Sequence, residues 1–191
     1  MEQIDSRPRQ VVIREVEWPR DRDAILNFDT SFTTTRIYRL KMDGLSARFI
    51  EEQLELPLAK RYDVSGIKVA VDESILAIVG EFEDRIAAFM TVKLETWNSR
   101  AWITHLYVDP EHRNLGIGKR LISEAIANAK SVSARGLWLE TQNFNYPAIQ
   151  FYRKLGFKFC GFDRSLYDPN RVPGETAIYF SLEFPDGQTK T

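Results

Sequence analysis

Runs of apolar residues with two different spacings divide the chain into short strands and short helices. Residues 11–17 are β-branched and weakly alternating, which predicts a first strand. Residues 20–29 have the composition of a short helix, and residues 30–42 that of an extended segment. Residues 44–56 are predicted to form a helix that ends before Pro57, because four apolar positions have helical spacing: Leu45, Phe49, Ile50 and Leu54.

Three strand-like runs follow in the middle of the chain, over residues 74–82, 85–97 and 100–108. The connections between them are short enough for hairpins, so the runs predict an antiparallel meander. The third run leads directly into a segment rich in glycine and basic residues, VDPEHRNLGIGKR.

The second half of the chain alternates helices and strands. After Gly116, one apolar stripe predicts a helix: Ile117, Leu121, Ile122, Ala125, Ile126 and Ala129. A strand over residues 136–142 comes next, then a helix over residues 146–156 with Pro147 in its first turn and Gly156 at its end. Two further strands are predicted over residues 157–162 and 176–184.

The central strand–helix–strand unit requires a right-handed crossover, so part of the sheet must be parallel. The predicted fold class is therefore mixed α/β (α+β). We expect one domain over residues 11–184, with a disordered N-terminus at residues 1–10 and a disordered tail at residues 185–191, because both ends are polar.

The overall composition limits the classes of function. A chain of 191 residues, 43% hydrophobic and 28% charged, fits one globular domain with a substantial core. Its net charge of -1 argues against a nucleic-acid partner. One cysteine excludes an internal disulfide, and two histidines leave little material for a metal site, so no metal is expected. Without a signal peptide or an apolar stretch of roughly 20 residues, we expect a cytoplasmic protein with no membrane partner.

Gly116 and Gly118 lie where a strand gives way to a helix. Backbone N–H groups at such a turn can converge on an anion, and the helix N-terminus adds partial positive charge. The spacing R-x-x-G-x-G lacks the lysine of a nucleotide P-loop and the third glycine of a dinucleotide site. Taken alone, the motif fits a phosphate-binding turn and a tight turn without a ligand equally well.

A second motif, NFNYPAIQFYRKLGF over residues 143–157, follows about thirty residues later. The two segments together resemble the GNAT superfamily of acyl-CoA-dependent N-acetyltransferases in order, spacing and element type. The resemblance implies a central mixed sheet of about seven strands flanked by helices, splayed between its fourth and fifth strands. It also implies acetyl-CoA as the acetyl donor. By that pattern the residues that hold acetyl-CoA are Leu106, Tyr107, Val108, Arg113, Asn114, Leu115, Gly116, Ile117, Gly118, Lys119, Asn145, Ala148 and Tyr152.

Acetyl transfer to an amine needs a neutral amine and a protonated leaving thiolate. By the family pattern, Tyr152 is the acid for the thiolate. The general base is open among three strand carboxylates, Glu81, Glu95 and Glu140. Glu140 is favoured, because alternation in WLETQ places it on one strand face with Trp138.

The only cysteine, Cys160, has no histidine nearby in sequence. We expect it to be a buried structural thiol, so transfer is predicted to be direct, in a ternary complex. The histidines at positions 105 and 112 are expected to be packing and surface residues. Lys119 and Arg120 fit either CoA phosphates or an exposed helix surface.

Three longer segments, from Trp97 to Ile122, from Gly136 to Asp168 and from Glu175 to Phe184, resemble the streptothricin (nourseothricin) acetyltransferases. The resemblance implies detoxification of a polycationic antibiotic by acetylation of an amino group of its β-lysine moiety. A cationic acceptor favours an acidic and aromatic groove. The predicted substrate-binding residues are Trp97, Trp138, Glu140, Tyr167 and Asp168, and Trp102, Tyr107, Asp163 and Glu175 are further candidates.

Other acceptors remain open at this point: an aminoglycoside, or a protein N-terminus or lysine. A protein of a different class, a non-enzymatic acyl-CoA sensor, is disfavoured by the intact Tyr152. A homodimer through sheet edges is left open, because no single feature of the sequence decides it.

Overall fold

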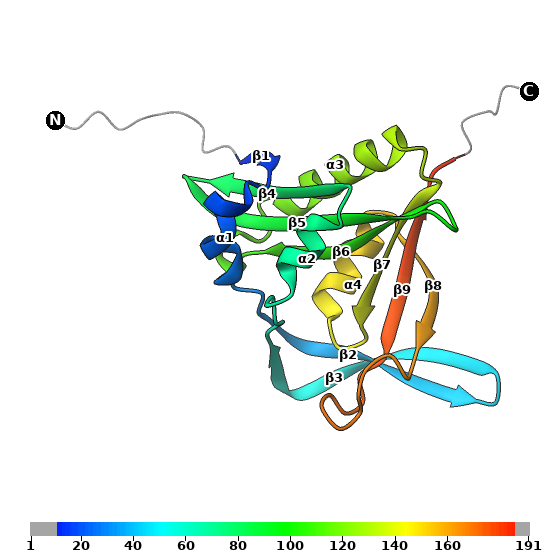
Figure 1. Ribbon diagram of the computed structural model, residues 1–191. Helices are drawn as coiled ribbons and strands as arrows, with labels where there is room; N and C mark the ends of the chain where they lie inside the picture. The colour runs from blue at the N-terminus through cyan, green and yellow to red at the C-terminus, as the bar shows by residue number, and fades with distance from the viewer. Residues whose placement is uncertain (1–10, 186–191) are drawn as a thin grey trace, which may run out of the picture.

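The computed structural model describes residues 11–185. The disorder predicted for residues 1–10 and 185–191 falls outside the described residues, except at position 185. Seven strands form one mixed sheet in the order β1-β4-β5-β6-β7-β9-β8 (Figure 1). Their bounds are Val12–Glu15 for β1, Leu76–Phe82 for β4, Arg85–Glu95 for β5, Arg100–Val108 for β6, Gly136–Gln142 for β7, Lys158–Asp163 for β8 and Ala177–Glu183 for β9.

Helices cover both faces of this sheet. On one face, α1 (Trp18–Leu26) and α2 (Ile67–Asp72) pack through Ile25 and Ile67 onto Val79 and Phe89. On the other face, α3 (Ile117–Ser131) and α4 (Tyr146–Lys154) pack onto neighbouring strand residues, among them Ile78, Met90 and Leu139. Adjacent strand residues thus enter different cores, as the alternation of a pleated strand requires. No helix within residues 11–185 is long and apolar enough to cross a membrane.

The meander predicted from the three central runs is confirmed, because β4, β5 and β6 pair antiparallel in sequence order. The crossover through α3 is confirmed as well, since β6 and β7 pair in parallel. The strand over residues 136–142 and the helix that starts at residue 146 also form as predicted. The sequence did not indicate α2 or the 3-10 turn at Pro110–His112.

The helix predicted over residues 44–56 is wrong. That segment lies in β3 (Ser46–Lys60), which pairs antiparallel with β2 (Phe32–Asp43) in a separate two-stranded sheet. The apolar positions do not form a buried helical stripe: Leu45 is fully exposed, whereas Phe49 packs against Phe159 and Phe162. Pairing with β2 and packing against β8 therefore override the local spacing. The β2–β3 hairpin projects below the main sheet in Figure 1.

Candidate active site

The central strands β6 and β7 separate part-way along their length. Their pairing runs from Arg100↔Gly136 to Ile103↔Leu139 and then stops. Beyond it, residues 104–108 and 140–142 no longer face each other as partners. A register shift against β5 leaves Thr104 as the extra residue of a bulge, which bends β6 at this point. The splay between the fourth and fifth strands of the sheet is thus confirmed.

The chain turns sharply at the end of β6. Asn114 (φ 64°) and Gly116 (φ 81°) both have left-handed backbones, and α3 begins directly after them. The N–H groups of the first helical turn have no partner inside the helix. Alternation of left- and right-handed residues at a helix N-terminus forms a concave nest of N–H donors, which suits a phosphate.

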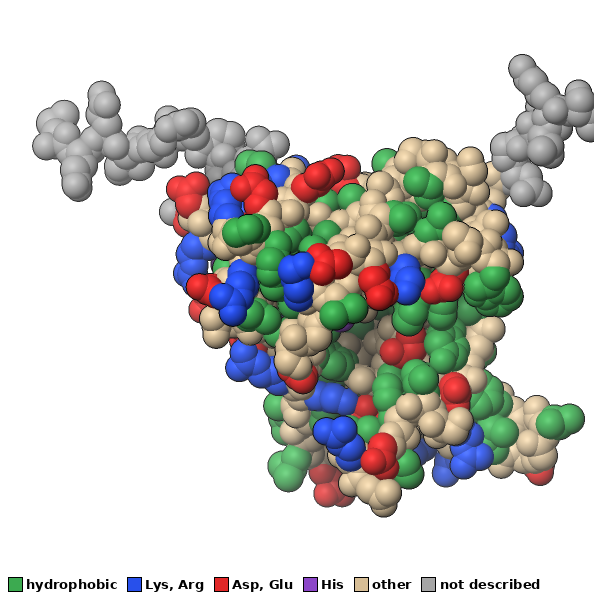
Figure 2. Space-filling view, in the orientation of Figure 1, with side chains coloured by type: hydrophobic (Ala, Val, Ile, Leu, Met, Phe, Trp, Pro, Cys, Tyr) green, Lys and Arg blue, Asp and Glu red, His purple; other side chains and the backbone are tan. Residues whose placement is uncertain are grey.

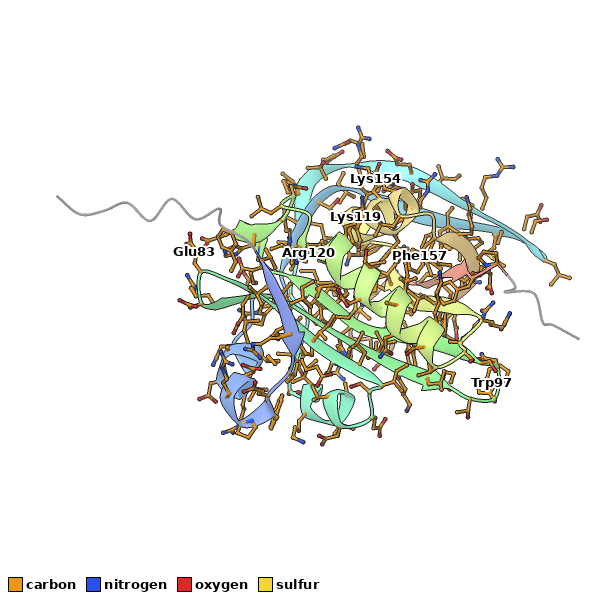
Figure 3. The ribbon with its side chains drawn as sticks, turned by 90° about the horizontal axis from the view of Figure 1, so that it is seen from above. Glu83, Trp97, Lys119, Arg120, Lys154 and Phe157 are labelled. Atoms are coloured by element: carbon orange, nitrogen blue, oxygen red, sulfur yellow. The ribbon has the colours of Figure 1, made fainter. Side chains whose placement is uncertain are left out.

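Arg113 contributes to this turn in a way that the sequence did not show. Its guanidinium donates to the backbone carbonyls of Val108, at 3.0 Å, and of Ser31. Arg120 is similarly committed to the carbonyl of Val11, at 2.6 Å. Both side chains therefore brace the turn, and two of the five N–H groups of the Arg113 guanidinium are committed to backbone carbonyls. Lys119 is exposed at the N-terminal end of α3 (Figure 3).

Glu140 lies on β7 just beyond Leu139, the last residue that pairs with β6. Its side chain is on the sheet face that also carries α1 and α2. The alternation predicted from the sequence is confirmed, because Leu137 and Leu139 are buried in the opposite core. Burial raises the pKa of the Glu140 carboxyl above its ordinary value, and a hydrogen bond from the Tyr167 hydroxyl opposes that rise. Such a carboxylate has the character of a general base.

Tyr152 comes from α4, on the other face of the sheet, with only 7% of its surface exposed. Its ring packs edge-on against Phe151 and Phe157. Burial raises the pKa of the phenol above its ordinary value, and the Tyr107 and Glu140 groups raise it further. The phenol is therefore protonated at neutral pH, the state that an acid requires. The contribution of Glu140 to that rise indicates that the phenol and the carboxylate are near enough to interact electrostatically.

Residues 35–157 match the acetyltransferase (GNAT) family. This match covers more than half of the chain and includes the splay, the glycine turn and α4. The chain belongs to the acetyltransferase (GNAT) family. A streptothricin acetyltransferase of Streptomyces lavendulae is 35% identical over 175 residues, which span 87% of this chain and 92% of that protein. A streptothricin acetyltransferase A of Bacillus subtilis is 30% identical over 71% of this chain and 79% of its own length.

Solved structures agree with the sequence matches. The crystal structure of a nourseothricin acetyltransferase superimposes with a TM-score of 0.83 at 35% identity, covering 92% of this chain and 99% of that chain. A Bacillus anthracis protein in complex with acetyl coenzyme A superimposes with a TM-score of 0.76 at 31% identity, covering 92% of this chain and 98% of the other. The protein is thus an acetyl-CoA-dependent acetyltransferase of the GNAT family, with the seven-stranded mixed sheet of that fold.

Gly116 and Gly118 of the glycine turn are restricted to small residues by different physical constraints. A Cβ on Gly118 would come within 3.0 Å of the Phe151 ring, so this position is small because α3 and α4 pack closely there. A Cβ on Gly116 would meet nothing within 4 Å, so a side chain has room there. Glycine is favoured at this position because its φ is positive. Gly116 is therefore the position that tests whether an anion binds at the turn.

We expect Gly116→Asp to weaken acetyl-CoA binding at least tenfold more than Gly116→Asn does. Both side chains have the same shape and both tolerate a left-handed backbone, so the variants differ only in one negative charge. Isothermal titration calorimetry with acetyl-CoA measures the two dissociation constants. Equal constants would show that no phosphate lies at this turn.

Asn145 and a tyrosine that the sequence analysis missed, Tyr62, link the start of α4 to the end of β7. Asn145 caps α4 by accepting from the Ala148 N–H at 3.2 Å. Its amide donates to the Tyr62 hydroxyl at 2.9 Å, and that hydroxyl donates to Gln142 Oε1 at 2.5 Å. Tyr62 lies just after β3, in the region where the sequence pattern predicted no strand, so no local signal marked it.

Of the predicted acceptor residues, the structure brings Trp138, Glu140 and Tyr167 together. The Trp138 ring stacks on Trp102 at 5.0 Å between centroids, on the same strand face as Glu140. Tyr167 reaches Glu140 from the loop between β8 and β9. These contacts place two indole rings, the Tyr167 phenol and the Glu140 carboxylate on one face of the sheet. Figure 2 shows this face hollowed between the main sheet and the hairpin.

The other two predicted acceptor residues are both exposed. Trp97 is 83% exposed on the β5–β6 turn, at the opposite end of the sheet from Lys119 (Figure 3). Asp168 is exposed and accepts from the Asn170 N–H at 2.9 Å, which closes a turn of its own loop. The structure therefore does not bring Trp97 to the splay, whereas Asp168 lies beside Tyr167 in the loop that reaches Glu140.

The two alternative bases are also remote from the splay. The carboxylate of Glu81 accepts from Arg14 at 2.5 Å and from Arg20 at 3.2 Å, so it is committed to ion pairs at the β1–β4 edge. Glu95 pairs in register with Arg100, at the end of β6 away from the glycine turn. Glu140 is left as the strand carboxylate beside Tyr152.

His105 and Cys160 are two other side chains that could act as an acid, a base or a nucleophile. Burial lowers the pKa of His105 to about 4, and its Nδ1 lies 2.9 Å from the Thr91 hydroxyl, so it is a neutral packing residue. Cys160 was expected to be buried, and this is wrong: it is exposed on the edge strand β8. Cys160 is the extra residue of a bulge in the β8–β9 pairing, between Phe159 and Gly161, at the edge of the sheet.

Proposed function

We propose that this enzyme acetylates an amino group of the β-lysine moiety of streptothricin and thereby inactivates the antibiotic. The observation that supports this acceptor most directly is the half-buried Glu140 carboxylate, which lies beside the splay on the same strand face as Trp138 and bonds the Tyr167 hydroxyl. An acidic and aromatic lining suits a polycationic amine. Two relatives that are at least 30% identical over more than two thirds of the chain are named streptothricin acetyltransferases, which supports the same acceptor.

Each step of the proposed reaction uses a residue at the splay. Glu140 takes one proton from the acceptor ammonium, and the freed nitrogen lone pair forms a bond to the acetyl carbon. The C–S bond breaks, and Tyr152 donates its proton to the departing sulfur. The nitrogen loses a second proton as the amide forms, and that proton restores the Tyr152 phenol. Because no enzyme nucleophile is needed, transfer is direct within a ternary complex.

Acetyl-CoA is proposed to lie across the glycine turn with its thioester arm in the splay. Residues 104–107 of β6 have no β7 partner there, so their backbone groups that point away from β5 are available to hydrogen-bond the amides of that arm. The turn binds through backbone N–H groups of residues 114–119, with Lys119 beside it, and Asn145 and Ala148 line the start of α4.

The acceptor is tested by measuring thiol release from acetyl-CoA in the presence of streptothricin, kanamycin, spermidine or a lysine peptide. We expect kcat/KM for streptothricin to exceed that for every other amine by at least a hundredfold. Mass spectrometry of the product should place one acetyl group on the β-lysine moiety. A higher kcat/KM for kanamycin or for the peptide would replace streptothricin with an aminoglycoside or a protein as the acceptor.

A further inference from the structure

Lys60 and Glu175 form an ion pair inside the protein, and neither side chain takes part in the reaction steps proposed above. Lys60 ends β3, and Glu175 ends the loop that precedes β9. The ammonium contacts both carboxylate oxygens, at 2.6 Å for Oε2, and only 19% and 6% of the two side chains are exposed. The same ammonium lies 5.6 Å from the centroid of the Tyr62 ring.

This ion pair adjoins the proposed base. The Tyr62 hydroxyl bonds Gln142, which lies two residues beyond Glu140 on the same face of β7. Glu175 precedes Thr176, whose backbone exchanges hydrogen bonds with Asn143 at the end of that strand. The charged and titratable groups that act on Glu140, or feel its charge, are Lys60, Glu175, Tyr62, Tyr107, Tyr152, Tyr167 and Tyr179.

The charges of this cluster do not balance when Glu140 is ionised. Burial raises the pKa of the phenols, to about 12 for Tyr107, so all five are neutral at pH 7. The charged members are then two carboxylates and one ammonium. Glu175 raises the pKa of Glu140 and Lys60 lowers it, so the two members of the ion pair act on the base in opposite directions.

We propose that the buried Lys60–Glu175 ion pair is a positioning element for Glu140: the Lys60 ammonium stabilises the ionised carboxylate of Glu140, and Glu175 holds that ammonium in place and limits its effect. The consequence for catalysis rests on the proposed role of Glu140 as the base. An ionised base beside one unbalanced negative charge also favours the arrival of one substrate ammonium.

The experiment is a titration of the Glu140 carboxyl by NMR in protein labelled at the glutamate side-chain carboxyl carbon, without substrates. The Glu140→Gln variant assigns the resonance. We expect Lys60→Met to raise the pKa of Glu140 by about one unit and Glu175→Gln to lower it by about one unit. The double variant should return it close to the original value, and Lys60→Arg, which keeps the charge, should leave it nearly unchanged.

Removal of Lys60 alone leaves Glu175 buried without a partner, which is strongly destabilising. If Lys60→Met does not fold, the comparison of Glu175→Gln with the double variant measures the effect of the ammonium on its own. The inference is overturned if the pKa of Glu140 is the same in these variants, or if Lys60→Met and Glu175→Gln move it in the same direction.

The fall of kcat/KM at low pH, the acid limb of its pH profile, separates this inference from the proposed function. If Glu140 is the base, the limb moves with the NMR titration in every variant. Opposite shifts of the NMR titration with an unmoved acid limb would uphold the coupling of the ion pair to Glu140 and would remove Glu140 from the role of base.

Discussion

Replacement of Tyr152 by phenylalanine is expected to reduce kcat by about 10²–10⁴, the usual range for loss of a general acid, with little change in the affinity for acetyl-CoA. The phenol is almost completely buried between the rings of Phe151 and Phe157, so phenylalanine preserves the packing of α4. Only the proton for the departing thiolate is lost. Steady-state rates and calorimetry with acetyl-CoA separate the two effects.

Tyr146→Phe is the matched control for this variant. Tyr146 starts the same helix, and its hydroxyl contacts Glu51 at 3.2 Å on the hairpin, away from the splay. We expect this control to keep nearly full kcat. The role of Tyr152 as the acid is refuted if Tyr152→Phe retains kcat in single-turnover measurements of the acetyl-transfer step.

The elements that carry the cofactor turn could be predicted because their signals are local. A strand that ends at Asp109–Pro110, a glycine with positive φ and an apolar stripe behind it occur within twenty residues. The start of α4 is equally local, since Asn145 caps the helix and Pro147 lies in its first turn. Caps and turn residues act over one helical turn, so the sequence displays them directly.

The acceptor side could not be predicted in the same way, because it depends on contacts between distant segments. Tyr62 bonds Gln142, and Lys60 bonds Glu175, across separations of 80 and 115 residues. Lys60 and Tyr62 follow the segment whose spacing predicted a helix, so the sequence did not indicate which side of the sheet their side chains would meet. Arg113 shows the same limit, because its guanidinium donates to the carbonyl of Ser31, a partner 82 residues away.

Replacement of Glu140 by glutamine is expected to reduce kcat/KM for the amine by about 10³ at pH 7. Without a base, only the neutral amine reacts, and an amine of pKa near 10 is about one part in a thousand neutral at that pH. The loss should shrink about tenfold for each pH unit up to that pKa. The wild-type enzyme should instead reach a plateau above the pKa of Glu140, which burial raises from the ordinary carboxyl value. Rates of thiol release from pH 6 to pH 10 give both profiles.

Glu95→Gln is the matched control, because it makes the same change in a strand carboxylate at the far end of β5 and β6. We expect it to leave the pH profile unchanged. Protonation of Glu140 removes the base, so the wild-type rate falls as pH drops through the pKa of Glu140. The glutamine variant has no such step in its pH profile. A variant profile parallel to the wild-type profile would show that the proton of the acceptor amine leaves by another route.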